Sequence, residues 1–158
     1  MAAAPDRAAP LSHHDLCFGC GQANLFGLQL EARPEGDGVV GRFFLKQDHQ
    51  GPPGTAHGGV LATALDETMS FAASGAAEGA PVMTAGMEVD YLEPAPIGTF
   101  VRIEARVESR EEGSVRTAAT ARTVGERARE VARARGTFAE VAGGGGPGSV
   151  LGRTERGS

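Results

Sequence analysis

The chain has 158 residues, of which 41% are hydrophobic, and a formal net charge of −5 at pH 7. A chain of this length can bury the core of one domain without disulfides or metal ions to support it. The acidic balance argues against binding to nucleic acid or to a membrane surface, because both are anionic. We therefore expect one globular domain that has neither of them as a partner.

Both ends of the chain lack the periodicity of packed elements. The Ala- and Pro-rich start is too short and too charged to hold the hydrophobic region of a secretory signal. The other end opens with four glycines at positions 143–146. We expect disordered segments over residues 1–14 and 142–158, a folded domain over residues 15–141, and a cytoplasmic location.

Two histidines and a Cys-x-x-Cys pair lie at the start of the folded part. His13, His14, Cys17 and Cys20 offer ligand atoms that zinc prefers. Their spacing differs from that of the common structural zinc sites, and no second Cys pair follows. A redox pair is less favoured still, because no thioredoxin-like sequence surrounds the cysteines. We interpret the segment as a tight glycine-rich turn with small buried sulfurs, and we expect no metal.

Two short strands are predicted next. Residues 28–32 and 39–46 are typical of strands, and the turn Glu35-Gly36-Asp37-Gly38 joins them as a hairpin.

The longest apolar stretch of the chain runs from Val60 to Ala77 and follows a Gly/Pro-rich loop. Its alanine, leucine and methionine content is typical of a buried helix, and the loop is a helix start signal. Two acids and the lack of a basic flank argue against a membrane span. A carboxylate in a core helix is costly unless it is paired or used, so Asp66 and Glu67 stand out. Glu67 points about 100° away from Asp66 on a helix and is interpreted as a salt-bridge or interface residue.

The spacing between the helix start and its first acid suggests a shared site. Gly58 and Asp66 lie about 12 Å apart along one helix, so one small reacting group cannot touch both within one chain. Two helices packed antiparallel across a two-fold axis would place each Asp66 near the other copy's helix N-terminus. The free N–H groups and the positive dipole end suit a developing oxyanion there. We interpret the stretch as half of a shared acyl-transfer site.

After the helix the chain turns to β-structure. Residues 83–92, 101–107 and 115–124 alternate as half-buried strands do. Residues 126–141 favour helix by propensity, yet their arginines share one parity, so we predict a strand with a solvated arginine face. The prediction is an α+β domain in which two strands, a long helix and four antiparallel strands follow one another, with the sheet wrapped around the helix.

The chain resembles the hotdog-fold thioesterases, in particular the phenylacetate-pathway-type (PaaI-like) acyl-CoA thioesterases. The resemblance covers residues 17–141. The matching motifs are Cys17-Phe18-Gly19-Cys20-Gly21, Asn24-x-x-Gly27-Leu28, His49-Gln50-Gly51, His57-Gly58-Gly59-Val60 with Asp66-Glu67, and Pro94-Ala95-Pro96-Ile97-Gly98. The resemblance implies a hotdog fold, in which a curved six-stranded antiparallel sheet surrounds a central helix. It also implies a homodimer with a continuous sheet, often paired into a tetramer, that hydrolyses an acyl-CoA thioester at the subunit interface. No cofactor is implied beyond the CoA of the substrate.

The resemblance also implies roles for the residues around the helix start. Asp66 matches the family's catalytic acid, and Gly58 with Gly59 matches the amides that polarise the thioester carbonyl. His57 matches the loop histidine that shapes the helix start. Asp66 would act as general base on water or attack directly to give an anhydride, and the sequence leaves both routes open.

Further site residues follow from the same resemblance. Ser70 and Thr84 match hydroxyl positions that hold the attacking water. Several relatives have Asn or Gln six or seven residues before His57, where Gln50 is the stand-in here and His49 is the second choice.

The sequence leaves two alternative functions and several details open. A non-catalytic acyl-CoA-binding or sensing module would share the fold. A hotdog dehydratase is disfavoured, because the core region has no Asp-x-x-x-x-His pair. Small residues along the helix suggest room for a medium or aromatic acyl group, and the arginines within residues 122–135 are candidates for phosphate contacts. The sequence does not decide between CoA and an acyl carrier protein, or between a dimer and a tetramer.

Overall fold

The computed structural model describes residues 9–142. Its elements in chain order are β1 (Glu31–Glu35), β2 (Gly38–Phe44), the 3-10 turn η1 (Gln47–His49), α1 (Gly58–Ala76), β3 (Val82–Tyr91), β4 (Phe100–Glu111), β5 (Ser114–Thr123) and β6 (Glu130–Glu140). Among the described residues, no helix is both long and apolar enough to cross a membrane.

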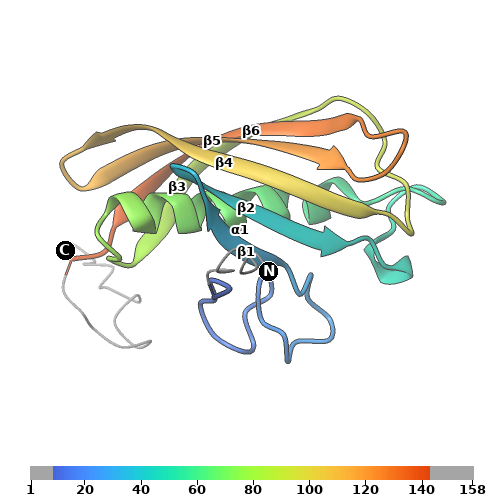
Figure 1. Ribbon diagram of the computed structural model, residues 1–158, viewed down its shortest axis with the longest axis horizontal. Coiled ribbons are helices and arrows are strands. Elements are labelled where there is room, and N and C mark those ends of the chain that lie inside the picture. Colours follow the sequence, from blue (N-terminus) through green and yellow to red (C-terminus); the bar gives the residue numbers. More distant parts are fainter. Residues whose placement is uncertain (1–8, 143–158) are drawn as a thin grey trace, which may run out of the picture.

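The six strands form one sheet in the order β1-β2-β4-β5-β6-β3, with every neighbouring pair antiparallel. The sheet curves over α1, which runs along its inner face (Figure 1). This arrangement confirms the predicted α+β hotdog architecture of a long helix and a six-stranded antiparallel sheet.

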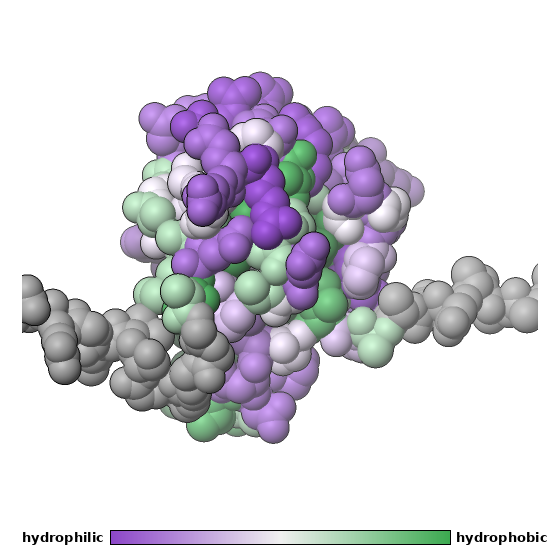
Figure 2. Space-filling view, turned by 90° about the vertical axis from the view of Figure 1, so that its left-hand side faces the viewer, coloured by the Kyte–Doolittle hydropathy of each residue, from purple (hydrophilic) through white to green (hydrophobic). Residues whose placement is uncertain are grey.

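The two faces of the sheet differ as the alternation in the sequence predicts. On β4, Val101 and Ile103 are fully buried toward the helix, whereas Glu104 between the buried positions is exposed. The end-on view in Figure 2 shows hydrophilic residues over the top of the molecule, where the outer face of the sheet lies. Burial of the inner face against α1 therefore provides the hydrophobic free energy of the fold.

The ambiguous segment near the C-terminal end is a strand, as its period of two indicates. On β6, Ala134 and Phe138 are buried while Arg133 and Arg135 are exposed. The strand begins at Glu130, because a turn with a Gly125 carbonyl accepting from the Ala128 amide precedes it. The strand forms despite the helix propensity of its residues, because β6 pairs with β5 and its apolar side chains pack against α1.

The predicted first strand is wrong in its position. Gln29 has a left-handed backbone with φ of 52°, so residues 28–30 cannot extend a strand. Leu28 and Leu30 are still buried, and their amides donate to the carbonyls of Phe18 and Gly19, each at 2.9 Å. The apolar alternation therefore marks a loop packed on the Cys-x-x-Cys turn, and the strand starts at Glu31.

The folded part begins earlier than residue 15. The Leu11 amide donates to the Ala32 carbonyl at 2.8 Å and extends the edge next to β1. Within residues 9–14, which we expected to be disordered, Leu11 is thus paired with the sheet. The expectations for residues 1–8 and 143–158 lie outside the described residues.

Candidate active site

The start of α1 is fixed by its preceding histidine. His57 is the N-cap residue, with an extended backbone, and its Nδ1 accepts a hydrogen bond from the Gly59 amide at 2.9 Å. Nδ1 is therefore the unprotonated ring nitrogen in this arrangement. The His57 side chain stabilises the helix N-terminus, which is the structural part of the role that we expected for it.

Gln50 and His49 hold the loop that leads to this cap. The Gln50 amide group donates to the Gln47 carbonyl at 3.1 Å and accepts from the Gly54 amide at 2.8 Å. His49 is buried, its Nδ1 accepts from the Lys46 amide at 3.1 Å, and burial lowers its pKa. Both side chains are thus occupied within the loop, and neither forms a hydrogen bond with Asp66 in the part of the chain described.

The two glycines at the helix start differ in what their amides do. The Gly59 amide is committed to His57, whereas Gly58 is the first residue of α1 and its N–H has no acceptor within the helix. Tyr91 at the end of β3 donates its hydroxyl to the Gly58 carbonyl at 2.9 Å. A Cβ at Gly58 would lie 3.2 Å from the Tyr91 ring, so the glycine permits this close approach. The Gly58 amide is therefore the better oxyanion candidate of the two.

A hollow of about 360 Å³ opens beside this helix start. Its walls include Pro52, Thr55, Gly58, Leu61 and Tyr91. Tyr91 was not identified as a site residue from the sequence. Two signals could have drawn attention to it: it is the single tyrosine of the chain, and it closes the strand before the Pro-x-Pro motif.

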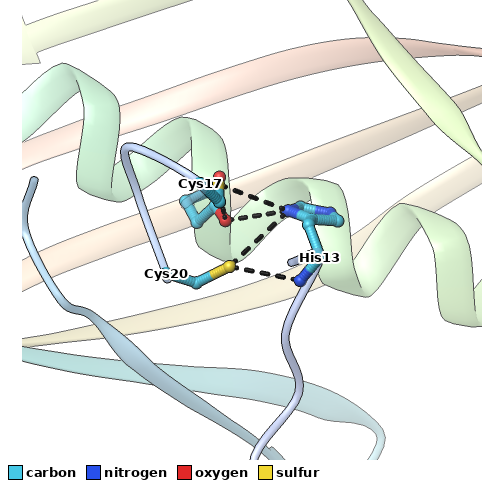
Figure 3. A group of neighbouring side chains, drawn as sticks. His13, Cys17 and Cys20 are labelled. Atoms are coloured by element: carbon cyan, nitrogen blue, oxygen red, sulfur yellow. Dashed lines mark hydrogen bonds and ion pairs between the residues drawn. The ribbon is translucent and has the colours of Figure 1, made fainter. Parts of the chain in front are cut away.

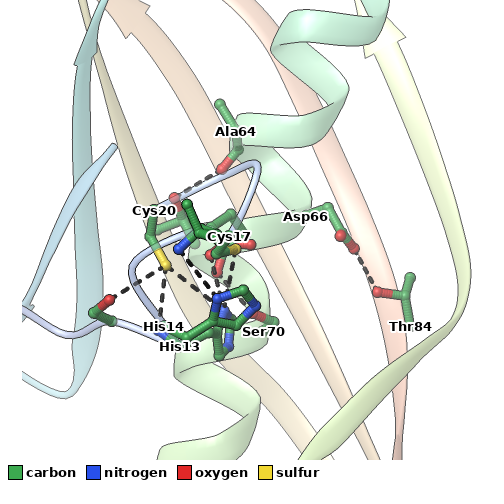
Figure 4. Close-up of polar contacts among 12 residues, drawn as sticks. His13, His14, Cys17, Cys20, Ala64, Asp66, Ser70 and Thr84 are labelled. Atoms are coloured by element: carbon green, nitrogen blue, oxygen red, sulfur yellow. Dashed lines mark hydrogen bonds and ion pairs between the residues drawn. The ribbon is translucent and has the colours of Figure 1, made fainter. Parts of the chain in front are cut away.

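Asp66 lies two turns further along α1 and contacts β3. Thr84 donates its hydroxyl to Asp66 Oδ1 at 2.6 Å (Figure 4). Burial raises the pKa of Asp66, and the hydrogen bond from Thr84 opposes this shift. A half-buried carboxylate with a raised pKa is suited to accept a proton from water. The structure thus brings together Asp66 and Thr84, two of the residues singled out from the sequence.

Ser70 is placed differently. It lies one turn after Asp66, but it is buried and donates its hydroxyl to the Glu67 carbonyl at 2.8 Å. This is the local bonding that a serine inside a helix often adopts. No hydrogen bond joins Ser70 to Asp66 among the described residues.

Gly58 and Asp66 belong to one continuous helix, so they stay about 12 Å apart along its axis within one chain. The strand beside them is the edge of the sheet. Of the strands described, β3 pairs with β6 alone, and none of its ten residues is buried. A long unprotected edge of this kind is a template for pairing with another strand.

A second group of side chains lies on another side of α1. His13, Cys17, Cys20 and Glu67 place their ligand atoms within 4.8 Å of one another. His14 is not part of the group, because its Nδ1 accepts from the Leu16 amide. The sequence predicted a salt-bridge or interface role for Glu67, and its ion-pair partner is His13 at 2.8 Å. The tight cysteine turn exists as predicted, but its proximity to Glu67 was missed because the fold alone creates it.

The chain is similar to known thioesterases. Residues 53–128 match the family model described as the thioesterase superfamily. The chain is 42% identical over 74 residues to acyl-coenzyme A thioesterase THEM4 of Xenopus laevis, a match that covers 47% of this chain and 32% of that protein. The chain therefore spans about a third of the length of this relative.

Solved structures share the fold. Zebra fish thioesterase superfamily member 2 superposes with a TM-score of 0.64 at 25% sequence identity, covering 71% of this chain and 81% of that chain. The E. coli PaaI protein from the phenylacetic acid degradation operon superposes with a TM-score of 0.66 at 18% identity, covering 78% and 85%. At that identity the likeness to PaaI concerns the fold alone. The chain has the hotdog fold, and its residues 53–128 are similar to the thioesterase superfamily.

Proposed function

We propose that the protein is an acyl-CoA thioesterase that hydrolyses a thioester to a free acid and CoA. The observation that carries this proposal is the Asp66–Thr84 pair, a half-buried carboxylate whose pKa is raised, beside an unpaired sheet edge. The similarity to a protein named acyl-coenzyme A thioesterase supports the substrate class. CoA enters as part of the substrate, and no further cofactor is required.

The active site is assembled from two copies of the chain. Pairing of β3 with β3 of a second copy would cover both exposed edges and extend the sheet across a homodimer. The two α1 helices would then run antiparallel, with Asp66 of one copy facing Gly58 of the other. This arrangement removes the separation of the two residues along a single helix.

The reaction divides between these two residues. The Gly58 amide donates a hydrogen bond to the thioester carbonyl oxygen and stabilises the negative charge that develops on it. Asp66 of the other copy takes a proton from water as the water attacks the carbonyl carbon. Collapse of the tetrahedral intermediate breaks the C–S bond, and the proton passes from Asp66 to the departing CoA thiolate. Thr84 orients the Asp66 carboxylate throughout.

A thiol-release assay over aryl, short-chain and medium-chain acyl-CoAs tests the proposal. Wild-type protein should release free CoA from at least one class. Asp66→Asn should reduce kcat/KM by about 100-fold or more, the range expected for loss of a general base. Asp37→Asn, the same change in the exposed β1–β2 turn, should leave the rate unchanged. Tight acyl-CoA binding without thiol release from any substrate would instead identify a binding module.

A further inference from the structure

Four side chains from two distant parts of the sequence, residues 13–20 and the middle of α1, converge beside the helix. His13 comes from the N-terminal segment, Cys17 and Cys20 from the turn that follows it, and Glu67 from the helix. Figure 3 shows His13, Cys17 and Cys20 directed toward one another next to the helix. None of these residues takes part in the proposed hydrolysis, so the group needs an explanation of its own.

The distances within the group match a tetrahedral metal site. His13 Nδ1 lies 3.8 Å from Cys20 Sγ, 3.9 Å from Cys17 Sγ and 2.8 Å from Glu67 Oε1. Cys17 Sγ lies 3.3 Å from the same carboxylate oxygen. Around a tetrahedral zinc ion with bonds of about 2.0–2.3 Å, ligand atoms lie about 3.3–3.8 Å apart. All four ligand atoms lie within 4.8 Å of one another, so side-chain shifts of up to about 1 Å would bring them to that geometry.

The surrounding residues hold the ligands in place. The His13 ring stacks on Phe71 with centroids 4.4 Å apart, which fixes the direction of its Nδ1. The His13 amide donates to Cys20 Sγ at 3.2 Å, a bond that stabilises a thiolate. A Cβ at Gly19 would lie 2.5 Å from Glu67 Cδ, so this glycine lets the turn close onto the helix.

The burial of these side chains favours the binding of a cation. Cys20 is 1% exposed and Glu67 is 8% exposed. The Cys17 thiol donates to the Glu67 carboxylate as long as it keeps its proton. Once the two thiols ionise, their charges and that of Glu67 repel one another in a low-dielectric environment, and a metal cation between them removes this repulsion. Two sulfurs, one imidazole nitrogen and one carboxylate oxygen suit zinc, because hard cations such as magnesium favour oxygen ligands alone.

We propose that His13 Nδ1, Cys17 Sγ, Cys20 Sγ and Glu67 bind a structural zinc ion. Binding releases the two thiol protons and the proton on His13 Nδ1 to solvent, and the four protein ligands close the coordination sphere. The ion fastens residues 13–21 to the middle of α1, one residue from Asp66. It therefore acts as a staple between the N-terminal segment and the helix that carries the proposed catalytic acid.

Metal analysis of the full chain tests this proposal independently of any hydrolysis. Protein expressed with zinc and purified without chelators should contain about one zinc ion per chain. Cys17→Ser and Cys20→Ser should each lower that content at least fivefold, and Glu67→Gln should lower the zinc affinity. His14→Ala is the matched control, and its zinc content should equal that of the wild type.

Cobalt substitution decides the matter without any variant. Reduced wild-type protein stripped of metal should bind one Co²⁺, with intense visible bands of tetrahedral cobalt and a near-ultraviolet thiolate-to-cobalt band. The proposal would be overturned if this protein took up neither zinc nor cobalt. Retention of full zinc content in a Cys17→Ser/Cys20→Ser double variant, or a Cys17–Cys20 disulfide in protein purified under reducing conditions, would overturn it equally.

Discussion

Asp66 and Glu67 are consecutive on α1, yet they lie in different surroundings. Asp66 reaches toward Thr84 on β3, on a different side of the helix from His13 and the two cysteines (Figure 4). Glu67 instead contacts His13 and Cys17. The step of about 100° between helical neighbours produces this separation. One acid therefore faces an open sheet edge, and the other is enclosed.

The pKa values of the two carboxylates are also shifted in opposite directions. Burial raises the pKa of Asp66, and the hydrogen bond from Thr84 opposes that shift without cancelling it. Burial acts in the same direction on Glu67, but hydrogen bonds from His13 and Cys20 outweigh it and leave the pKa of Glu67 below its usual value. The bond to Glu67 in turn raises the pKa of His13 to about 9. Two carboxylates that are adjacent in sequence thus have opposite pKa shifts, in line with the reactive role that we propose for Asp66 and the structural role that we propose for Glu67.

The most direct test of the different roles of Asp66 and Glu67 is to neutralise each acid in turn. Asp66→Asn should lower kcat/KM by about 100-fold or more while the melting temperature stays near that of the wild type. Glu67→Gln should lower kcat/KM by less than about tenfold, but it should reduce the melting temperature by about 2–4 °C or more, because it removes the charge of a buried carboxylate that is paired with His13. Thiol release and thermal denaturation measure both. Equal losses of activity in the two variants would contradict the division.

A second pair of substitutions tests whether the Gly58 amide at the start of α1 takes part in the reaction. Gly58→Pro removes the amide proposed to bind the oxyanion, at a helix position where proline is favoured and after a residue whose extended backbone tolerates it. We expect kcat/KM to fall by about 100- to 1,000-fold. Gly58→Ala adds the same Cβ beside Tyr91 but keeps the amide, so it should retain most of the activity. Similar rates for both variants would exclude the amide from the reaction.

Substitution of Thr84, which contacts Asp66, should have a smaller effect on kcat/KM. Thr84→Val removes the hydroxyl bonded to Asp66 but keeps the branched shape, and we expect kcat/KM to fall by about tenfold. Thr84→Ser keeps the hydroxyl and should stay within about twofold of wild type. Steady-state kinetics on the best acyl-CoA would show the difference, and no difference would mean that Thr84 does not orient Asp66.

Removal of the proposed zinc ion should lower the thermal stability of the protein. A chelator should lower the melting temperature of the wild type by about 4–12 °C, and added zinc should restore it. Cys20→Ser should melt at the same temperature with and without chelator. A wild-type melting temperature that does not respond to chelator would argue against the zinc staple.

The fold followed from the sequence because its signals are local. Alternation on β4 and the apolar run of α1 each specify one buried face, and the period of two identified β6 against its helix propensity. The first strand was misplaced because Gln29 adopts a left-handed conformation that no alternation pattern reveals.

Only part of the candidate site could be predicted from the sequence. Asp66 stood out as a carboxylate in an apolar helix, and its partner Thr84 was found through the family resemblance. The bond from Tyr91 to Gly58 spans 33 positions and that from His13 to Glu67 spans 54, so both depend on tertiary packing. Gln50 was expected to stand in for the Asn or Gln that relatives have before His57, but its amide group forms hydrogen bonds within its own loop, a contact that spacing alone does not reveal.

Subunit mixing tests the central claim, that Asp66 of one copy and Gly58 of another serve the same carbonyl. Asp66→Asn and Gly58→Pro chains, each inactive alone, would be unfolded together, refolded as a mixture and assayed for thiol release. Random pairing makes half of the dimers mixed, and each mixed dimer has one intact site, so about a quarter of the wild-type rate should return. If both residues served a site within one chain, every site in the mixture would stay defective. A mixture no more active than its two components would contradict the shared site.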